Sequence, residues 1–436
     1  MKIKSDKMEL RFKRNNLYML LVIVFLIVDA RFFYLINLPH ILGGAASNKF
    51  MESIISVSVF IIYLTVMKKF RLSIGEFGNW IITLFLILVV NAVHSVGVYG
   101  YSLTTVAWPC IPFAIFFMYF PLREWLRIKQ NYECFIKTGE IISSILSVLF
   151  IVQVVIYKGL DTVFLELDGA IMDRYIYTPS LGLRIYSVFD GFIRVFILLV
   201  VYKIIAQNFK KCFRDMISFL LMLLAILLVD QSRYYLATLL VCCGIIFIVE
   251  NRKRLGLRSF VMLLLTGLTS LLLVFKSVGS ILNAILENDG SFDARIKAIA
   301  YFLRTVCDHV ICGMGLVVPG EGVHYYYITG PEGLYHYDDV GVIGVLASLG
   351  LIGFLWYAGI TIKLIKISWK RLKYNALAVG LVAGFVLSIL TMSYLDKGRI
   401  ISFMLMLVIL DIELWKDTIR NKSVRVLYAM ENTWKR

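Results

Sequence analysis

Four arginines in the polar stretches of the chain are candidates for binding phosphate. Arg184 ends one such stretch, Arg233 stands in a short turn, and Arg295 and Arg304 lie in a third stretch. A guanidinium can bind two phosphate oxygens at once and stays charged at any relevant pH. Arginines brought together from different elements can therefore enclose a diphosphate.

Acidic, imidazole and phenol groups follow in residues 335–339. His336, Asp338 and Asp339 are candidate proton acceptors or hydrogen-bond partners for a hydroxyl group, and Tyr335 is a candidate for stacking on a sugar. Structural roles stay open for all four. An Asp before a helix complements the positive end of that helix, and aromatic rings anchor proteins at membrane surfaces.

A metal site is not expected in this chain. Cys307 and Cys312 have Asp308 and His309 between them, but this spacing is loose and no second group of ligands follows. We therefore expect no metal and no other cofactor. The chain also lacks the motif G-x-x-x-x-G-K-[ST], which disfavours ATP-driven work.

The elements that position these residues are predicted to be membrane helices. Hydrophobic residues make up 60% of the 436 residues, and Asp, Glu, Lys and Arg make up 17%. Ordinary globular proteins are roughly half apolar and a quarter charged. The composition therefore disfavours a soluble enzyme, a disordered regulator and a disulfide scaffold. It indicates a single transmembrane domain over 1–436.

Apolar runs divide this domain into spans. Only helices and closed barrels satisfy backbone polar groups in lipid, and the runs lack the alternation of strands. We predict an all-α polytopic membrane protein with about 12 transmembrane helices, which use roughly 240 residues at about 20 each. The runs are 17–36, 50–67, 78–97, 104–120, 135–157, 186–206, 214–230, 234–249, 258–275, 340–362, 375–393 and 398–415.

The net charge of +16 is a topology signal. Of the 45 lysines and arginines, 32 fall in the two ends and in alternate connections between the apolar runs. The positive-inside rule then predicts that the N- and C-termini are both cytoplasmic. Nucleic acid is therefore not an expected partner, although a basic soluble chain would suggest one.

Two long loops, 158–185 and 276–339, then lie outside, and we expect the chemistry there. In the second loop Ile296, Ile299, Ala300 and Leu303 follow a helical spacing. This spacing predicts a helix along the membrane surface that holds Arg295 near the site. Binding of its basic residues to lipid headgroups is the alternative.

Charged residues also occur within the apolar runs. Arg194 lies four residues after Asp190, and this pair is expected to neutralise itself on one helix face. Asp29 and Arg31 are expected to serve the packing of the bundle.

As a set, the motifs resemble the O-antigen ligase and polymerase-like membrane protein family. The resemblance covers the layout of the whole chain and, at the level of motifs, about 180–240 and 290–355. The glycines of the Gly350-Leu-Ile-Gly353 piece also have a structural interpretation, since they are expected to let helices approach closely. The matching pieces are Ser232-Arg233, Asp-Ala-Arg295, Asp308-His309 followed by Gly313-Met-Gly315, and Gly350-Leu-Ile-Gly353.

The resemblance implies a GT-C-like architecture and a metal-independent glycosyltransferase that uses undecaprenyl-pyrophosphate-linked sugars at the outer leaflet. Arg184, Arg233 and Arg295 would take the family's phosphate-facing roles. Many ligase-like members carry a His-Asn near the start of the tenth span, and that His position falls here on Asp339, with His336 three residues earlier. This departure favours polymerase over ligase.

We therefore expect a polymerase of surface polysaccharide, such as O-antigen or capsule, in the bacterial inner membrane. A lipid-linked oligosaccharide would be both donor and acceptor, and a chain-length regulator and a flippase are further expected partners besides the lipid bilayer. A ligase is the alternative. A flippase or other transporter is the rival from another class, but it should place ionisable residues near the midplane. The expected catalytic residues are Arg295, Arg233, Asp339 and His336, and the expected pyrophosphate- and sugar-binding residues are Arg184, Arg304, Asp338 and Tyr335.

Overall fold

The protein is a helical bundle with one short hairpin. The computed structural model describes residues 17–30, 47–66, 74–160, 162, 175–178, 182–185, 191–210, 212–252, 290–318, 325–330, 333, 335–372, 375–389 and 391–434. The apolar run 258–275, Asp190 and Arg31 lie outside these ranges, as does the side chain of Arg233.

Helices make up most of the described residues, as the apolar runs predict. The first part of the bundle contains an apolar helix Leu17–Asp29, then α3 (Ser47–Val66), α4 (Gly78–Tyr99), α5 (Leu103–Cys110), the 3-10 helix η2 (Ile111–Met118), α6 (Tyr119–Leu126) and α7 (Lys129–Leu160). The second part contains α9 (Ile193–Ala206), α10 (Phe213–Ala225), the π-helix η3 (Ile226–Asp230), α11 (Arg233–Asn251), α13 (Gly290–Asp308), α14 (Tyr325–Thr329), η4 (Tyr337–Asp339), α15 (Val342–Arg371), α16 (Ala376–Ser388) and α17 (Ile400–Trp434).

Five of the described helices are long and apolar enough to cross a membrane. They are Gly78–Tyr99, Leu103–Leu126, Lys129–Leu160, Tyr234–Asn251 and Val342–Arg371. The prediction of a helical membrane protein is therefore confirmed at the level of a mostly helical chain with apolar spans. The count of about 12 spans stays a prediction.

A hairpin breaks the all-helical pattern in the first long loop. Strand β1 (Tyr175–Thr178) pairs antiparallel with β2 (Gly182–Ile185), with Thr178 opposite Gly182. The sequence analysis did not predict these strands. The hairpin brings β2 against η3 and α7.

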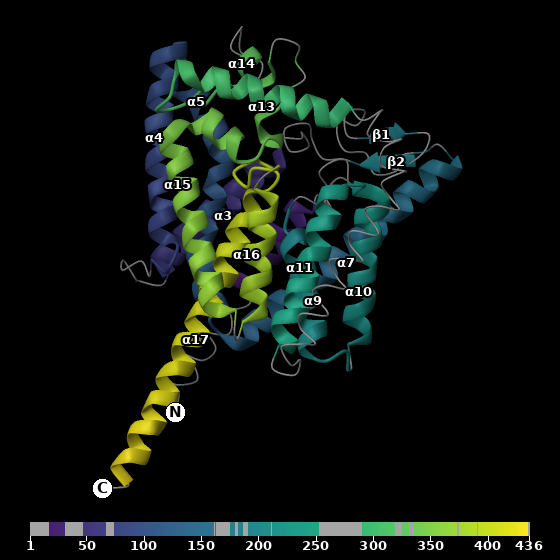
Figure 1. Ribbon diagram of the computed structural model, residues 1–436, viewed down its shortest axis with the longest axis vertical. Helices are drawn as coiled ribbons and strands as arrows, with labels where there is room; N and C mark the ends of the chain where they lie inside the picture. The colour runs from purple at the N-terminus through teal and green to yellow at the C-terminus, as the bar shows by residue number, and fades with distance from the viewer. Residues whose placement is uncertain are drawn as a thin grey trace.

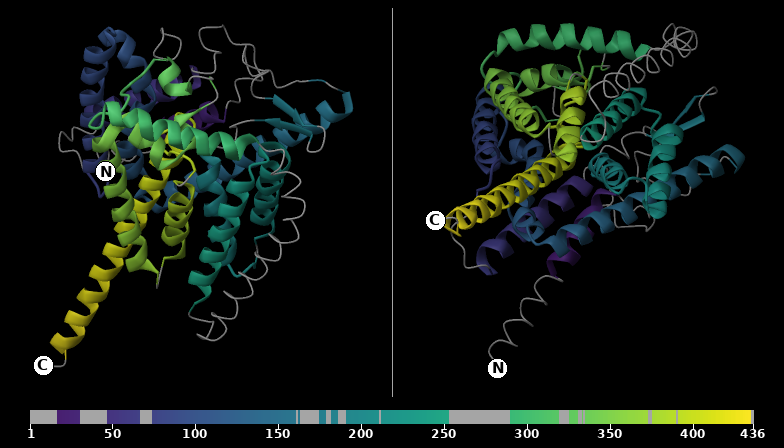
Figure 2. Two further views of the ribbon diagram at one scale, coloured as in Figure 1. Left: turned by 45° about the horizontal axis from the view of Figure 1, so that its top comes forward. Right: turned by 60° about the horizontal axis from the view of Figure 1, so that its bottom comes forward.

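Helix α13 lies across one end of the bundle, as Figures 1 and 2 show, while α17 extends beyond the opposite end. The face of α13 that packs on the protein carries Ala298, Phe302 and Val306, one helical turn apart, against residues of α15 and the segment before it. The predicted helix is present. Ile296 and Leu303 of its expected apolar stripe are exposed.

Helix α15 is interrupted at Gly350, and a loop fills the interruption. Gly350 adopts φ 66° and ψ −164°, which breaks the helical hydrogen bonds around it. The loop supplies replacements. Met314 N donates to Ala347 O (2.7 Å), Leu351 N to Val310 O (2.9 Å) and Ile352 N to Ile311 O (3.3 Å). Backbone N–H and C=O groups that lose their helical hydrogen bonds within a membrane span need such partners inside the protein.

Glycine is required at this crossing for close approach. A Cβ at Gly350 would clash with the backbone N of Gly313 and the backbone O of Ile311. Its positive φ is also a conformation that residues with a Cβ rarely adopt. The expectation that Gly350 serves helix–helix contact is therefore wrong, because the close neighbour is the loop after α13.

The interruption gives a test of stability. Gly350→Ala is expected to destabilise the protein by at least about 1 kcal/mol, because the new Cβ meets backbone atoms and φ is positive. The midpoint of thermal unfolding in detergent measures this. Gly97→Ala is the matched control, since nothing lies within 4 Å of its Cβ position in α4. An unchanged midpoint for Gly350→Ala would contradict the described crossing.

Candidate functional site

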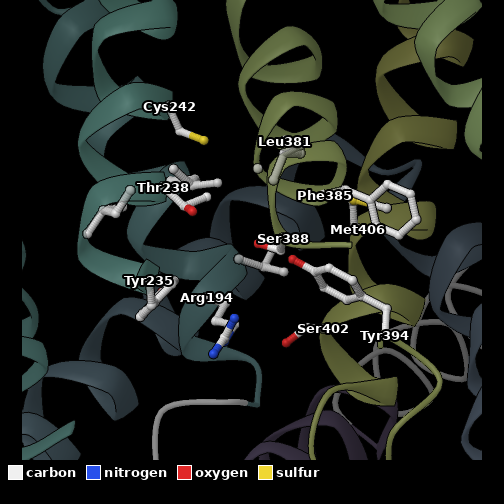
Figure 3. A pocket seen from close by; sticks show the side chains of 14 residues that line it. Arg194, Tyr235, Thr238, Cys242, Leu381, Phe385, Ser388, Tyr394, Ser402 and Met406 are labelled. Atoms are coloured by element: carbon white, nitrogen blue, oxygen red, sulfur yellow. The ribbon is translucent and has the colours of Figure 1, made fainter. Parts of the chain in front are cut away.

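A cavity lies between α9, α11, α16 and α17 (Figure 3). Its volume is about 30 Å³, which is room for roughly two water molecules. One part is apolar and the other carries hydroxyl groups around a guanidinium. The apolar part includes Leu198, Leu239, Leu381, Phe385 and Met406, and the polar part includes Arg194, Tyr235, Thr238, Ser388, Tyr394 and Ser402.

Arg194 is the cation of this cavity. It is only 6% exposed, and its guanidinium lies 4.2 Å from the centre of the Tyr235 ring. Its Nη1 also lies 3.6 Å from Met392 Sδ. A guanidinium over an aromatic ring is stabilised by the ring electrons, more so when solvent is excluded. The expected partner Asp190 lies outside the described residues, so the pairing of Asp190 with Arg194 stays a prediction.

Contacts from two other helices fix the first turn of α9, which carries Arg194. Asp29 accepts a hydrogen bond from Phe192 N (3.0 Å), and Ser402 Oγ donates to Gly191 O. Phe192 is the residue before α9, so the Asp29 carboxylate satisfies one of the free N–H groups at the helix start.

A buried ionic cluster holds Asp29 in turn. Lys49 Nζ lies 2.8 Å from Asp29 Oδ1 and 2.9 Å from Glu52 Oε2, and all three residues are buried. The expectation that Asp29 serves the packing of the bundle is confirmed.

A second buried arginine, Arg399, lies directly before α17. It is 7% exposed and faces a group of carboxylates. Its Nη1 lies 3.4 Å from Asp396 Oδ2, its Nη2 lies 3.9 Å from Asp339 Oδ1, and Nη1 donates to Asp338 O at 3.3 Å. The structure therefore joins Asp338 and Asp339 to a cation that the sequence analysis missed.

The two aspartates of η4 differ in their surroundings. Loss of solvation, and then the negative charge of Asp396, hold the pKa of Asp338 well above its usual range. A hydrogen bond with Asp396 adds to this effect. This raised pKa favours the protonated form of Asp338, which makes Asp338 a less suitable proton acceptor than an ionised carboxylate. Asp339 has a half-exposed side chain and remains the candidate to meet a hydroxyl group.

Arg184 lies against the turn that precedes α11. Its Nε donates to Asp230 O (2.8 Å), and Gln231 Nε2 donates back to Leu183 O (3.3 Å). The turn is sharp because Gln231, with φ 51°, ends the π-helix η3. Arg184 and the backbone of Arg233 are thus brought together, and Tyr235 links the same turn to Arg194.

The remaining predicted residues lie on α13 and in the segment before α15. Arg295 is partly exposed. It lies seven residues, or about two helical turns, before the buried Phe302, so it is on the packed face of α13. Arg304 lies two residues after Phe302 and is exposed. His336 is exposed. Tyr335 packs its ring 5.5 Å from that of Tyr301, so it also has a structural role.

The predicted residues are therefore brought together in part. The cavity among the described side chains is lined by Arg194, not by Arg184 or Arg295. Asp338 and Asp339 share one cluster with Arg399, and Arg184 contacts the turn of Arg233. A single site that holds Arg184, Arg233 and Arg295 stays a prediction. A charged residue within an apolar run was the signal that singled out Arg194, and the same signal could have found Arg399 in the run 398–415.

A comparison with protein families matches part of the chain. Residues 217–358 match the family model described as O-antigen ligase. The matched range begins in α10 and ends in α15, so it includes Arg233, Arg295 and Asp339. A comparison with curated proteins finds no match. Residues 217–358 are thus similar to the O-antigen ligase family, within a chain whose apolar helices indicate an integral membrane protein.

Proposed function

We propose that the protein is a polysaccharide polymerase of the bacterial inner membrane. It transfers an oligosaccharide from one undecaprenyl-pyrophosphate carrier to the sugar of another at the outer face. The observation that carries the proposal is the arrangement of cations and carboxylates at the α13 end of the bundle. Arg194 at the start of α9 contacts Tyr235, Arg184 contacts Asp230 O before α11, and Arg399 before α17 contacts Asp339.

The proposed topology gives this end its side of the membrane. We assign the termini to the cytoplasm and about 12 spans to a GT-C-like bundle, from the distribution of basic residues. The α13 end then faces outward, on the side of the membrane where the proposed lipid-linked substrate is located. Helix α13 lies along the membrane surface in this assignment.

The reaction needs no redox or energy source beyond the donor itself. A hydroxyl group of the acceptor repeat attacks the anomeric carbon of the donor, and the bond from that carbon to the pyrophosphate oxygen breaks. The lipid pyrophosphate leaves with the bonding electrons, and Asp339 takes the hydroxyl proton. We assign no metal to this step.

Arginines stabilise the negative charge that develops on the leaving pyrophosphate. Arg233 and Arg295 are the proposed contacts of the pyrophosphate, with Arg184 beside them. Loss of one well-placed donor to an anionic transition state costs roughly 3–4 kcal/mol in known enzymes. Such a cluster is therefore a sufficient source of much of the rate increase. His336 and Asp338 are proposed to contact sugar hydroxyl groups near Asp339.

Substitutions on α11 and α13 test these roles. Arg233→Ala and Arg295→Ala should each lower polymer formation by about 100- to 1,000-fold, since each removes a proposed phosphate contact. Gel profiles of cell-surface polysaccharide measure the loss, and immunoblots of membranes check that the variants are inserted. Lys297→Ala is the matched control on α13, and most activity should remain because Lys297 is an exposed cation with no proposed phosphate contact. Full-length polymer from both test variants would exclude the proposed site.

A ligase is the second candidate, because the matching family model is described as O-antigen ligase. A ligase would attach finished glycan to a different acceptor, whereas a polymerase uses a second lipid-linked repeat. The two functions therefore differ in the acceptor that they need.

The purified full-length protein distinguishes the two functions. Incubation with only the lipid-linked repeat, isolated from cells that lack this protein, should give a ladder of longer glycans on lipid. A product that forms only after a separate lipid acceptor is added would identify a ligase and contradict the polymerase assignment. The Arg233→Ala variant is the inactive control.

A further inference from the structure

Arg399 occupies a position that is unfavourable unless other groups compensate it. It lies at the N-terminal start of α17, where the partial positive charge of the helix repels a cation. It is also almost fully buried near the end of an apolar run. Burial of a charge in this setting is costly without partners. The carboxylates of Asp339 and Asp396 supply them.

The contacts of Arg399 join two segments that are distant in sequence. The segment before α15 carries Asp338 and Asp339, and the connection between α16 and α17 carries Asp396. Besides the contact of Arg399 with Asp338 O, Ser393 N donates to that same oxygen (3.3 Å). Val342 N donates to Ile389 O (2.9 Å), which adds a third link. The position of Asp339 is therefore set by the start of α17.

Carboxyl groups from both segments surround Arg399. Asp338 and Asp396 are joined by a hydrogen bond between their carboxyl groups. The guanidinium of Arg399 faces the carboxyl groups of Asp396 and Asp339. The titratable and charged groups that face this cluster from the packed elements are Tyr337, Asp338 and Asp339 of η4, Tyr357 of α15, Tyr394 and Asp396 of the connection, and Arg194 of α9 near Tyr394.

We propose that Arg399 is a positioning residue for glycosyl transfer, which orients the Asp339 carboxylate toward the acceptor hydroxyl. The inference rests on the proposed function and adds a role that neither the motifs nor the family match assigns. The guanidinium suits this role because its planar fork reaches the backbone of Asp338 and two carboxylates at once.

The pH dependence of the reaction tests the proposal. If Asp339 accepts the proton, the kcat/KM for lipid-pyrophosphate release falls at acidic pH, where its carboxylate takes up a proton. A carboxylate that loses a neighbouring positive charge takes up a proton more readily, so Arg399→Gln should shift this acidic limb upward by about one pH unit. Arg399→Lys should leave the limb near its original position and lower kcat, because the charge stays and the fork is lost. Asp339→Asn should remove the limb.

Two further variants keep the test decisive. Asp396→Asn removes a negative charge from the cluster, so it should shift the limb in the opposite direction. It serves in place of Arg399→Gln if that variant does not fold. Arg371→Gln breaks an ion pair with Asp417 (3.0 Å) near the end of α15 farthest from η4, and it should leave the limb unmoved.

The outcomes separate this inference from the proposed function. An acidic limb that stays in place in Arg399→Gln and in Asp396→Asn, with only the overall rate reduced, would overturn the positioning role while glycosyl transfer stands. Absence of any lipid-pyrophosphate release by the wild-type protein would overturn the proposed function itself. The purified full-length chain and the lipid-linked repeat described above serve for all of these measurements.

Discussion

The structure depends on one constraint, that charged and polar groups buried among apolar helices must find partners within the protein. Arg194 meets this constraint with the ring of Tyr235, and Arg399 meets it with the carboxylates around Asp339. Lys49 meets it between Asp29 and Glu52. These contacts join the start of α9 to α11 and the start of α17 to the segment before α15, so the same interactions that stabilise buried charges also assemble the candidate site.

The interruption of α15 obeys the same constraint on the backbone. The loop after α13 donates and accepts the hydrogen bonds that the kink at Gly350 releases. The site therefore has a fixed link from α13, which carries Arg295, to α15, which follows Asp339. The opposite end of the bundle uses buried charges differently. Arg123 and Tyr119 both contact Asp411, which ties α6 to α17.

The helices and several site residues could be predicted from the sequence, because apolar length and helical spacing are local signals. The arrangement of these residues could not. The spacing predicts α13 but does not decide which face packs, and Phe302 rather than Leu303 turned out to be buried. From the sequence, Gly350 is interpreted as a site of helix–helix contact, because the loop after α13 that actually contacts it is distant in sequence. Arg399 reads as part of an apolar run, since its partners Asp338 and Asp339 lie sixty residues away.

The central claim is that a lipid diphosphate binds at the α13 end of the bundle. A cryo-electron microscopy structure of the full-length protein with the lipid-linked repeat tests it most directly. We expect density for the diphosphate beside the guanidinium groups of Arg233 and Arg295, with the acceptor sugar near Asp339. Diphosphate density at the opposite end, near Arg123 and Asp411, or density that touches none of these arginines, would contradict the account.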